Sequence, residues 1–245
     1  MNRGLDQPDE AIPGPAHRTV VIQRQLLAKN ARQADENRGD FQQHKVAVVN
    51  LLSSPGSGKT RLLERTIDEY GRHRAIGVLV GDLQTENDAR RLSGRGAPVV
   101  AITTQNVCHL EAEMIALAYR ELDLARLDLL VVENVGNLVC PSSFDLGEAA
   151  RVVVLSTTEG EDKPLKYPKA FKTSQLVLIN KIDLAEAVEF DREAALSNIL
   201  AVSPQAQILE VSARTGQGMN AWYDYLEQLI VGQTIGSMST AALSP

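Results

Sequence analysis

The amino-acid sequence predicts an α/β fold, with a doubly wound, mainly parallel sheet and helices on both faces. Two observations predict it. Short runs of β-branched residues alternate with amphipathic stretches along most of the chain. In addition, an apolar run ending at Leu52 passes through a Gly- and Ser-rich turn into a helix-like stretch near Lys59. Such folds bind ligands at the carboxyl ends of their strands, so this turn lies where a ligand site is expected.

Each element of that fold follows from its local pattern. Seven short apolar runs, rich in Val, Ile and Leu, have the length of buried strands. These strand candidates are residues 46–52, 75–81, 97–102, 127–133, 151–156, 175–180 and 206–211. The amphipathic stretches between them are helix candidates, at residues 59–71, 85–95, 108–122, 190–201 and 217–231. Because strands and helices alternate, right-handed crossovers would make the sheet mainly parallel.

The two ends of the chain differ from this core. Residues 1–16 contain three prolines, two glycines and several acids, so we expect a disordered tail there. Residues 17–44 carry a rough apolar stripe among Arg, Gln and Asn, which is compatible with a helical extension. One domain is expected over residues 45–232, followed by a flexible tail of small residues over 233–245.

Composition argues against several classes of protein. The chain of 245 residues is 44% apolar, which is enough for a sizeable core. Its formal net charge of −6 argues against a dedicated nucleic-acid binder. No apolar run approaches the ~18 residues of a membrane span, and the N-terminus lacks the apolar core of a secretory signal. We therefore expect a cytoplasmic protein whose two cysteines are thiols or metal ligands rather than a disulfide.

A phosphate-binding loop follows the first strand candidate. Its residues are Ser53, Ser54, Pro55, Gly56, Ser57, Gly58, Lys59 and Thr60. Backbone N–H groups of such a loop converge on an anion, and the dipole of the following helix adds partial positive charge. Lys59 would contact the β- and γ-phosphates and act in catalysis, and the Thr60 hydroxyl would bind Mg²⁺. The usual pattern starts with Gly where this chain has Ser53, but its Gly-Lys-Thr core is intact.

A second motif predicts the base of the nucleotide. Asn180, Lys181 and Asp183 follow the strand candidate 175–180. The Asp183 carboxylate would accept hydrogen bonds from N1–H and the exocyclic amine of guanine, whereas adenine would leave it unsatisfied. Asn180 would brace the loop, and Lys181 would lie along the base plane. The backbone of Ser212 and Ala213, after the last strand, would meet the guanine O6, with a plain turn as the alternative. We therefore expect GTP or GDP as the nucleotide.

Together these motifs resemble the G domain of GTPases, and three longer segments resemble the HypB family of the SIMIBI class. Members of that family are GTPases that help insert nickel into [NiFe] hydrogenase. The segments are residues 81–85, 133–141 and 158–168. Residues 30–38 also resemble the helix before the G domain in that family. The resemblance covers about residues 20–232 and implies that residues 45–232 form a GTP-binding domain of the P-loop NTPase fold.

The resemblance assigns roles to three further residues. Asp82 would bind or orient Mg²⁺ in a switch I region and take part in catalysis. Glu133 would contribute to Mg²⁺ and nucleotide binding, and Gly136 would sense the γ-phosphate in switch II. Asp82 and Glu133 also end apolar strands on the ligand side, although capping of a turn is an alternative for each. No general base or arginine finger stands out, and phosphoryl transfer needs positioning and charge neutralisation more than covalent chemistry.

The two cysteines lie beside other signals. Cys108 and His109 start the helix candidate 108–122, and Cys140 precedes a proline. Thiolate and imidazole groups suit Zn²⁺ and Ni²⁺, and a cysteine at a helix N-terminus has a lowered pKa that favours the thiolate. From the residues alone, buried core cysteines are the more frequent alternative. The resemblance implies instead that Cys108, His109 and Cys140 form a Ni²⁺ or Zn²⁺ site at the interface of a GTP-dependent homodimer.

These inferences lead to one principal hypothesis. The chain would be a GTP-hydrolysing metallochaperone that assists nickel insertion into [NiFe] hydrogenase, with a hydrogenase maturation partner and the hydrogenase large subunit as partners. A related chaperone for urease is an alternative, but the Cys-Pro-His run of that family is divided here between 108–109 and 140–141. A nucleotide-gated metal-binding scaffold is another, and guanine specificity argues against a P-loop kinase. Residues 1–44 lack Cys and hold only two His, so no second tight nickel site is expected there.

Overall fold

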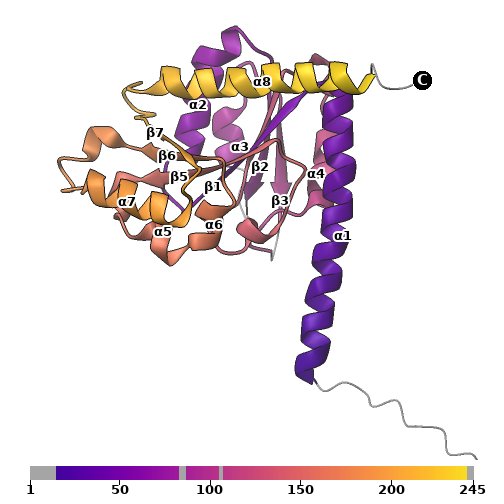
Figure 1. Cartoon of the computed structure of the whole chain (residues 1–245). Coiled ribbons are helices and arrows are strands. Elements are labelled where there is room, and N and C mark those ends of the chain that lie inside the picture. Colours follow the sequence, from indigo (N-terminus) through magenta and orange to yellow (C-terminus); the bar gives the residue numbers. More distant parts are fainter. Residues whose placement is uncertain (1–14, 83–86, 105–106, 242–245) are drawn as a thin grey trace, which may run out of the picture.

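The computed structural model describes residues 15–82, 87–104 and 107–241. These residues form one sheet of seven parallel strands with helices on both faces (Figure 1), which confirms the predicted doubly wound α/β fold. The strands are β1 (Ala47–Ser53), β2 (Ile76–Asp82), β3 (Val99–Thr103), β4 (Leu129–Glu133), β5 (Ala150–Ser156), β6 (Leu176–Asn180) and β7 (Gln207–Glu210). Their order across the sheet is β3-β2-β4-β1-β5-β6-β7. The central strands β1, β4, β5 and β6 are buried along their whole length, as expected where both faces of a sheet are covered.

The helices divide between the two faces of the sheet. The long helices are α1 (Pro15–His44), α2 (Lys59–Glu69), α4 (Ala112–Tyr119), α7 (Arg192–Val202) and α8 (Met219–Ala241). The short ones are α3 (Asn87–Leu92), α5 (Lys163–Lys166) and α6 (Pro168–Lys172). On one face Leu62 of α2 and Trp222 of α8 pack on the strands. On the other, Phe41 of α1 and Ile115 of α4 cover one half, and Phe171 of α6 covers the rest.

The structure corrects three sequence-based boundaries. Helix α8 continues to Ala241, past the predicted end at residue 231 and into the predicted tail 233–245, because no proline interrupts it there. Helix α4 begins at Ala112 rather than at residue 108. The sequence pattern showed no helix at α5 and α6, because each is too short to display a helical period; both have a proline in the first turn. Helix α1 begins at Pro15 rather than at residue 17. Residues 1–14 and 242–245, which belong to the predicted tails, lie outside the described residues.

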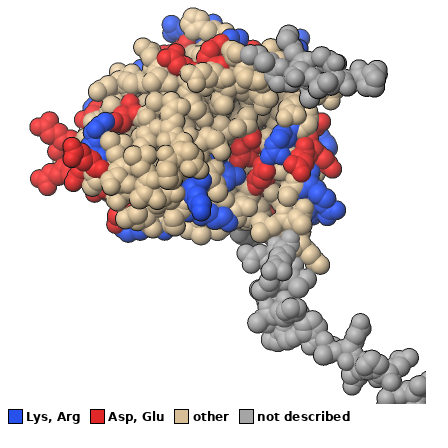
Figure 2. All heavy atoms as spheres, in the orientation of Figure 1, with Lys and Arg blue, Asp and Glu red and all other residues tan. Residues whose placement is uncertain are grey.

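The surface carries charges of both signs. Figure 2 shows Lys and Arg interspersed with Asp and Glu, and on the described part of this face the basic side chains form no continuous patch. Such mixing is typical of a solvated protein surface. Within the described ranges, no helix combines the length and the apolar character needed to cross a membrane.

A buried ion pair fixes the loop of residues 140–148 to the sheet. Arg151 donates to Glu148 Oε1 through Nε (2.9 Å) and Nη2 (2.7 Å). The same guanidinium donates to the backbone oxygens of Ser142 and Phe144. Only 10% of the Arg151 side chain and 6% of the Glu148 side chain are exposed. Arg151 therefore neutralises a buried carboxylate and holds the loop closed.

Arg151→Met is expected to lower the free energy of unfolding by about 3–5 kcal/mol, because it leaves the Glu148 carboxylate buried without a counter-charge. Urea unfolding followed by circular dichroism measures this loss. The control is Lys29→Met, which removes the exposed pair between Lys29 and Glu113 and should cost no more than about 1 kcal/mol. Equal losses in the two variants would contradict the anchoring role of Arg151.

Candidate nucleotide and metal sites

A cleft of about 510 Å³ lies at the carboxyl end of β1. It is lined by the phosphate loop, by Gly81 of β2, by residues of α3 and by the segment after β4. Strand β1 is the point at which the strand order reverses, and open α/β sheets bind ligands at such a point. The same strand order brings Asp82, Glu133, the phosphate loop, Asn180 and Ser212 to one edge of the sheet in that sequence. Residues predicted to contact Mg²⁺, phosphate and base thus follow one another along this edge.

Two glycines allow the phosphate loop to bend. Gly56 and Gly58 have φ angles of 75° and 97°, in the left-handed region that favours glycine. A Cβ atom on Gly58 would lie 2.6 Å from Nδ2 of Asn180, so this position has no room for a side chain. Helix α2 begins at the next residue, Lys59, and the positive end of its dipole therefore lies at the loop. This geometry suits a phosphate group.

Lys59 lies within this loop with only 7% of its surface exposed. Its Nζ donates a hydrogen bond to Ser53 Oγ at 2.6 Å, and burial lowers the pKa of Lys59. Ser53 is the residue that stands where the usual pattern has Gly. Its hydroxyl therefore has a structural role, since it holds the Lys59 ammonium group at the start of the loop.

Oxygen atoms suited to a magnesium ion gather beside the loop. The Thr60 hydroxyl donates to Glu133 Oε1 at 2.7 Å. Glu133 is 3% exposed, and burial raises its pKa to about 7. Its other oxygen, Oε2, is buried and has no hydrogen-bond partner among the described residues. A hydroxyl and a carboxylate are ligands that Mg²⁺ prefers, so this pair fits the ion. Asp82 ends β2 at the same edge, and the predicted switch I residues 83–85 lie outside the described residues.

Arginines that the sequence analysis did not assign also line the cleft. They are Arg61 of α2 and Arg91 of α3. The carboxylate of Glu64, which is 5% exposed, accepts hydrogen bonds from Arg61 (2.9 Å) and from Arg91 (3.2 Å). Each arginine also lies three residues from an acid on its own helix, Arg61 from Glu64 and Arg91 from Asp88, but this spacing does not show that either side chain lines the cleft. Fixed guanidinium groups at this edge suit a polyphosphate.

The predicted base-binding residues are tied to the phosphate loop by hydrogen bonds. Asn180 Nδ2 donates to Ser57 O at 2.9 Å, and its Oδ1 accepts from Ala213 N at 3.1 Å. Lys181 has a left-handed backbone with φ of 63°, and its Nζ donates to Gly56 O at 2.7 Å. Asn180 therefore holds two loops together. One is the predicted phosphate loop, and the other is the loop after β7 that contains Ala213.

Asp183 lies next to this brace, beside the 510 Å³ cleft rather than in its lining. Its carboxylate accepts hydrogen bonds from Ser212 Oγ and from Arg214 Nε. The bond from Ser212 and the charge of Arg214 hold the pKa of Asp183 below its usual range. The Asp183 side chain is 9% exposed, whereas that of Arg214 is 69% exposed. The carboxylate is therefore ionised and held in position by two hydrogen bonds.

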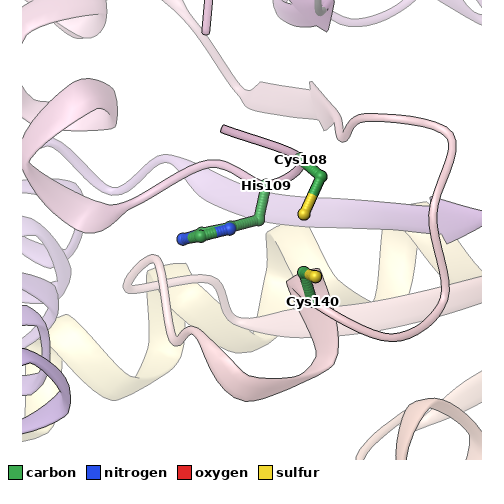
Figure 3. A group of neighbouring side chains, drawn as sticks. All are labelled: Cys108, His109 and Cys140. Carbon is green, nitrogen blue, oxygen red and sulfur yellow. The ribbon is translucent and has the colours of Figure 1, made fainter. Parts of the chain in front are cut away.

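Cys108, His109 and Cys140 come together at the same edge of the sheet. One ligand atom from each lies within 4.8 Å of the others. Figure 3 shows the two sulfur atoms on facing segments, with the imidazole beside them. The expected thiolate at a helix N-terminus is wrong, because α4 starts only at Ala112 and a hydrogen bond to Cys140, with burial, raises the pKa of Cys108. A bound metal ion would favour the thiolate form of both cysteines, because metal ions bind the deprotonated form.

The environment of His109 is compatible with its predicted role as a metal ligand. Its ring stacks on Phe144 with centroids 3.9 Å apart, and neither ring nitrogen has a hydrogen-bond partner among the described residues. Burial lowers its pKa, which favours the neutral form that binds metals, and Glu111 Oε1 lies 3.5 Å from Nε2. Two thiols and an imidazole fit Ni²⁺ or Zn²⁺, and a closed tetrahedral site requires one more ligand.

One segment of the chain leads from the cleft to this cluster. After β4, Gly136 packs against the phosphate loop, where a Cβ atom would lie 3.2 Å from Pro55 Cα. The next residue, Asn137, donates from Nδ2 to Cys108 O at 3.2 Å. The chain then reaches Cys140. The segment that contains the predicted phosphate sensor therefore packs on the phosphate loop, contacts the backbone of Cys108 and carries Cys140.

Both ends of the segment 134–148 are tied to Asn50, a fully buried residue of β1. Asn134 Nδ2 donates to Asn50 Oδ1 at 3.1 Å. Asn50 Nδ2 in turn donates to Glu148 Oε1 at 3.2 Å. The side chain at the centre of the sheet therefore holds the start and the end of this segment.

Comparisons with known proteins identify relatives of this chain in sequence and in fold. Residues 47–210 match the family model described as CobW/HypB/UreG, nucleotide-binding domain. The hydrogenase maturation factor HypB of Azotobacter chroococcum mcd 1 is 49% identical over 211 residues, which cover 86% of this chain and 69% of that protein. The crystal structure of HypB from Helicobacter pylori in complex with nickel is 38% identical and has a TM-score of 0.80, covering 83% of this chain and 96% of that one. A signal recognition particle protein from Aeropyrum pernix K1, 15% identical with a TM-score of 0.53 over 78% of this chain and 49% of its own, shares the fold alone.

Proposed function

This chain belongs to the HypB family, and from that premise we propose that it is a GTP-hydrolysing metallochaperone that assists nickel insertion into [NiFe] hydrogenase. The observation that carries the proposal is the segment from Gly136 to Cys140, which touches the phosphate loop at one end and the candidate metal cluster at the other. The similar proteins are hydrogenase maturation factors, and one was crystallised with nickel, which supports the target and the cargo.

Binding and hydrolysis of GTP would use the charged groups of the cleft. Lys59, held at the phosphate loop, would offset negative charge on the β- and γ-phosphates. Thr60, Asp82 and Glu133 would hold Mg²⁺, which supplies further positive charge at the phosphate oxygens. Arg91, fixed by Glu64, would add a cation to the same cleft. Hydrolysis then depends on positioning and charge, and no covalent step on the protein is needed.

Delivery of a metal ion requires a site that releases it. Cys108, His109 and Cys140 supply three donors, so a second copy of the chain or a partner would complete the coordination. In this proposal GTP favours the homodimer that shares the ion. Hydrolysis then weakens the shared site and passes Ni²⁺ or Zn²⁺ to a maturation partner and on to the hydrogenase large subunit.

Exchange of GDP for a non-hydrolysable GTP analogue is expected to change the Ni²⁺ affinity by roughly 5- to 150-fold, the usual range of coupling between two sites. The reason is that a γ-phosphate contacting Gly136 restrains the segment that carries Cys140. Competition with a chromophoric chelator measures the affinity in each nucleotide state, and light scattering records the oligomer mass. Cys140→Ala should lose metal binding and coupling while its guanine-nucleotide affinity stays close to that of the wild type.

Three outcomes would separate this proposal from its rivals. Equal Ni²⁺ affinities in the two nucleotide states would end the coupling hypothesis, even if all three residues proved to be ligands. A Cys140→Ala protein that is less stable but keeps the nucleotide effect would mark Cys140 as a structural thiol. Coupling without measurable GTP turnover, alone or with a partner, would favour a nucleotide-gated scaffold.

A further inference from the structure

Helix α1 contacts both segments that carry the candidate metal ligands. In Figure 1 it stands beside α4 and extends past the rest of the described protein. Cys108 and His109 lie on the chain just before α4, and Cys140 starts the loop 140–148. These two segments come from different crossovers of the sheet, so their spacing is not set by the strands alone.

Asn30 bridges the two segments with a single side chain. Its Oδ1 accepts a hydrogen bond from Ala112 N at 2.8 Å, at the start of α4. Its Nδ2 donates to Asp145 O at 2.7 Å, in the loop 140–148. Asn30 is only 7% exposed, so both bonds lie largely out of water, where an unpaired partner is costly.

Asn37, about two turns further along α1, repeats the bridge. Its Nδ2 donates to Ala112 O at 2.8 Å and to Leu146 O at 3.1 Å. Asn37 is fully buried. The same residue of α4 is therefore held through both its N–H and its C=O, each by a different asparagine of α1.

The helix and the loop also touch directly. Arg38 Nη2 donates to both carboxylate oxygens of Asp145, at 3.0 and 2.7 Å. Gly147 has a φ angle of 90°, and a Cβ atom there would lie 2.7 Å from Ala34 O. A backbone approach this close leaves the loop little freedom to move relative to α1.

We propose that α1 positions the metal site, with Asn30 and Asn37 as positioning residues that fix the distance between the Cys108–His109 segment and Cys140. The inference rests on the proposed metal site and adds that helix α1 sets the geometry of that site. Ala112 is three residues after His109, and Asp145 is five residues after Cys140. Short tethers of this kind transmit a shift of either anchor to the ligand atoms. Groups that orient metal ligands from behind typically contribute a factor of about 10–100 to metal affinity.

The test measures Zn²⁺ affinity by chelator competition, with Co²⁺ absorption as a probe of ligand geometry. Asn30→Ala removes both bonds of the bridge. Asn30→Asp has the same shape, keeps an acceptor for Ala112 N and loses the donor to Asp145 O. The matched control is Arg32→Ala, an exposed position on the same helix. Thermal unfolding of the metal-free proteins sets a titration temperature at which every variant is folded.

Both Asn30 variants are expected to bind Zn²⁺ about 10- to 100-fold more weakly than the wild type, and their Co²⁺ complexes should lose thiolate charge-transfer intensity. Arg32→Ala should match the wild type, and the GTP affinity of the metal-free proteins should be unchanged in all three variants. A folded Asn30→Asp protein with wild-type Zn²⁺ affinity would overturn the proposal, because a helix that only packs on the domain would lose stability without changing metal binding.

Cys140→Ala, titrated alongside, separates the two levels of the argument. If it binds Zn²⁺ as tightly as the wild type, the proposed metal site itself is wrong. If it loses the ion while Asn30→Asp keeps it, the metal site stands and the positioning role of α1 is wrong.

Discussion

Asp183→Asn is expected to reverse the base preference of the protein, from GTP to xanthosine triphosphate. Guanine offers two donors to the Asp183 carboxylate, whereas an amide at this position would accept from N1–H but place its own N–H against the exocyclic amine of guanine. Xanthine has a carbonyl at C2 that accepts the new donor. Sites built to hydrogen-bond one group reject its analogue by ~10⁴-fold or more, and a change of that order in the ratio of the two affinities is expected.

The measurement is a fluorescence competition titration with GTP, xanthosine triphosphate and ATP. Arg214→Ala is the matched control, because it removes a largely exposed partner of Asp183 and leaves the carboxylate and Ser212 in place. We expect it to keep the preference for GTP, since the carboxylate that would accept from the base and its hydrogen bond from Ser212 both remain. Competition by ATP as strong as that by GTP in the wild type would show that this motif does not read the base.

Lys59→Ala is expected to abolish GTP hydrolysis, with a loss in kcat of at least roughly 10²–10³-fold and much weaker nucleotide binding, because it removes positive charge from the transition state. The fold should survive. Burial lowers the pKa of Lys59, so the ammonium is itself unfavourable in this position, and its removal opens no apolar cavity.

Phosphate release under single-turnover conditions and urea unfolding test the two parts of this expectation. Lys172→Ala, at an exposed position outside the cleft, is the control and should behave as the wild type. A folded Lys59→Ala protein with near-normal turnover would remove Lys59 from the catalytic assignment.

The sheet and the phosphate loop were accessible to sequence reasoning because their determinants are local. Uninterrupted apolar runs mark strands that are buried on both faces, and β1 is fully buried as that pattern requires. The two glycines of the loop are needed for a left-handed backbone within one turn, which Gly56 and Gly58 both adopt. The cluster of Cys108, His109 and Cys140 could be assembled only through family resemblance, since nothing local links positions so far apart in the chain.

The features that sequence reasoning missed depend on contacts between distant residues. Arg91 of α3 is held at the cleft by Glu64 of α2, and no local pattern links these two residues, which lie 27 positions apart. The link between Lys59 and Ser53 is visible only when the loop closes on itself. The lowered pKa expected for Cys108 was wrong for the same reason, because it depended on where α4 begins and on the neighbouring thiol of Cys140.

The attachment of residues 134–148 to Asn50 at both ends limits how far a signal can move this part of the chain. With its start and its end held to the centre of the sheet, only the middle of the segment, where Cys140 lies, is left to shift. The change that follows GTP hydrolysis would then be a small displacement of one loop, with no rotation of a domain. Loop motions of this kind take roughly nanoseconds to microseconds. A nickel ion would be gained or lost through a change in a few ligand distances. Such a protein could cycle many times without exposing its apolar interior to water.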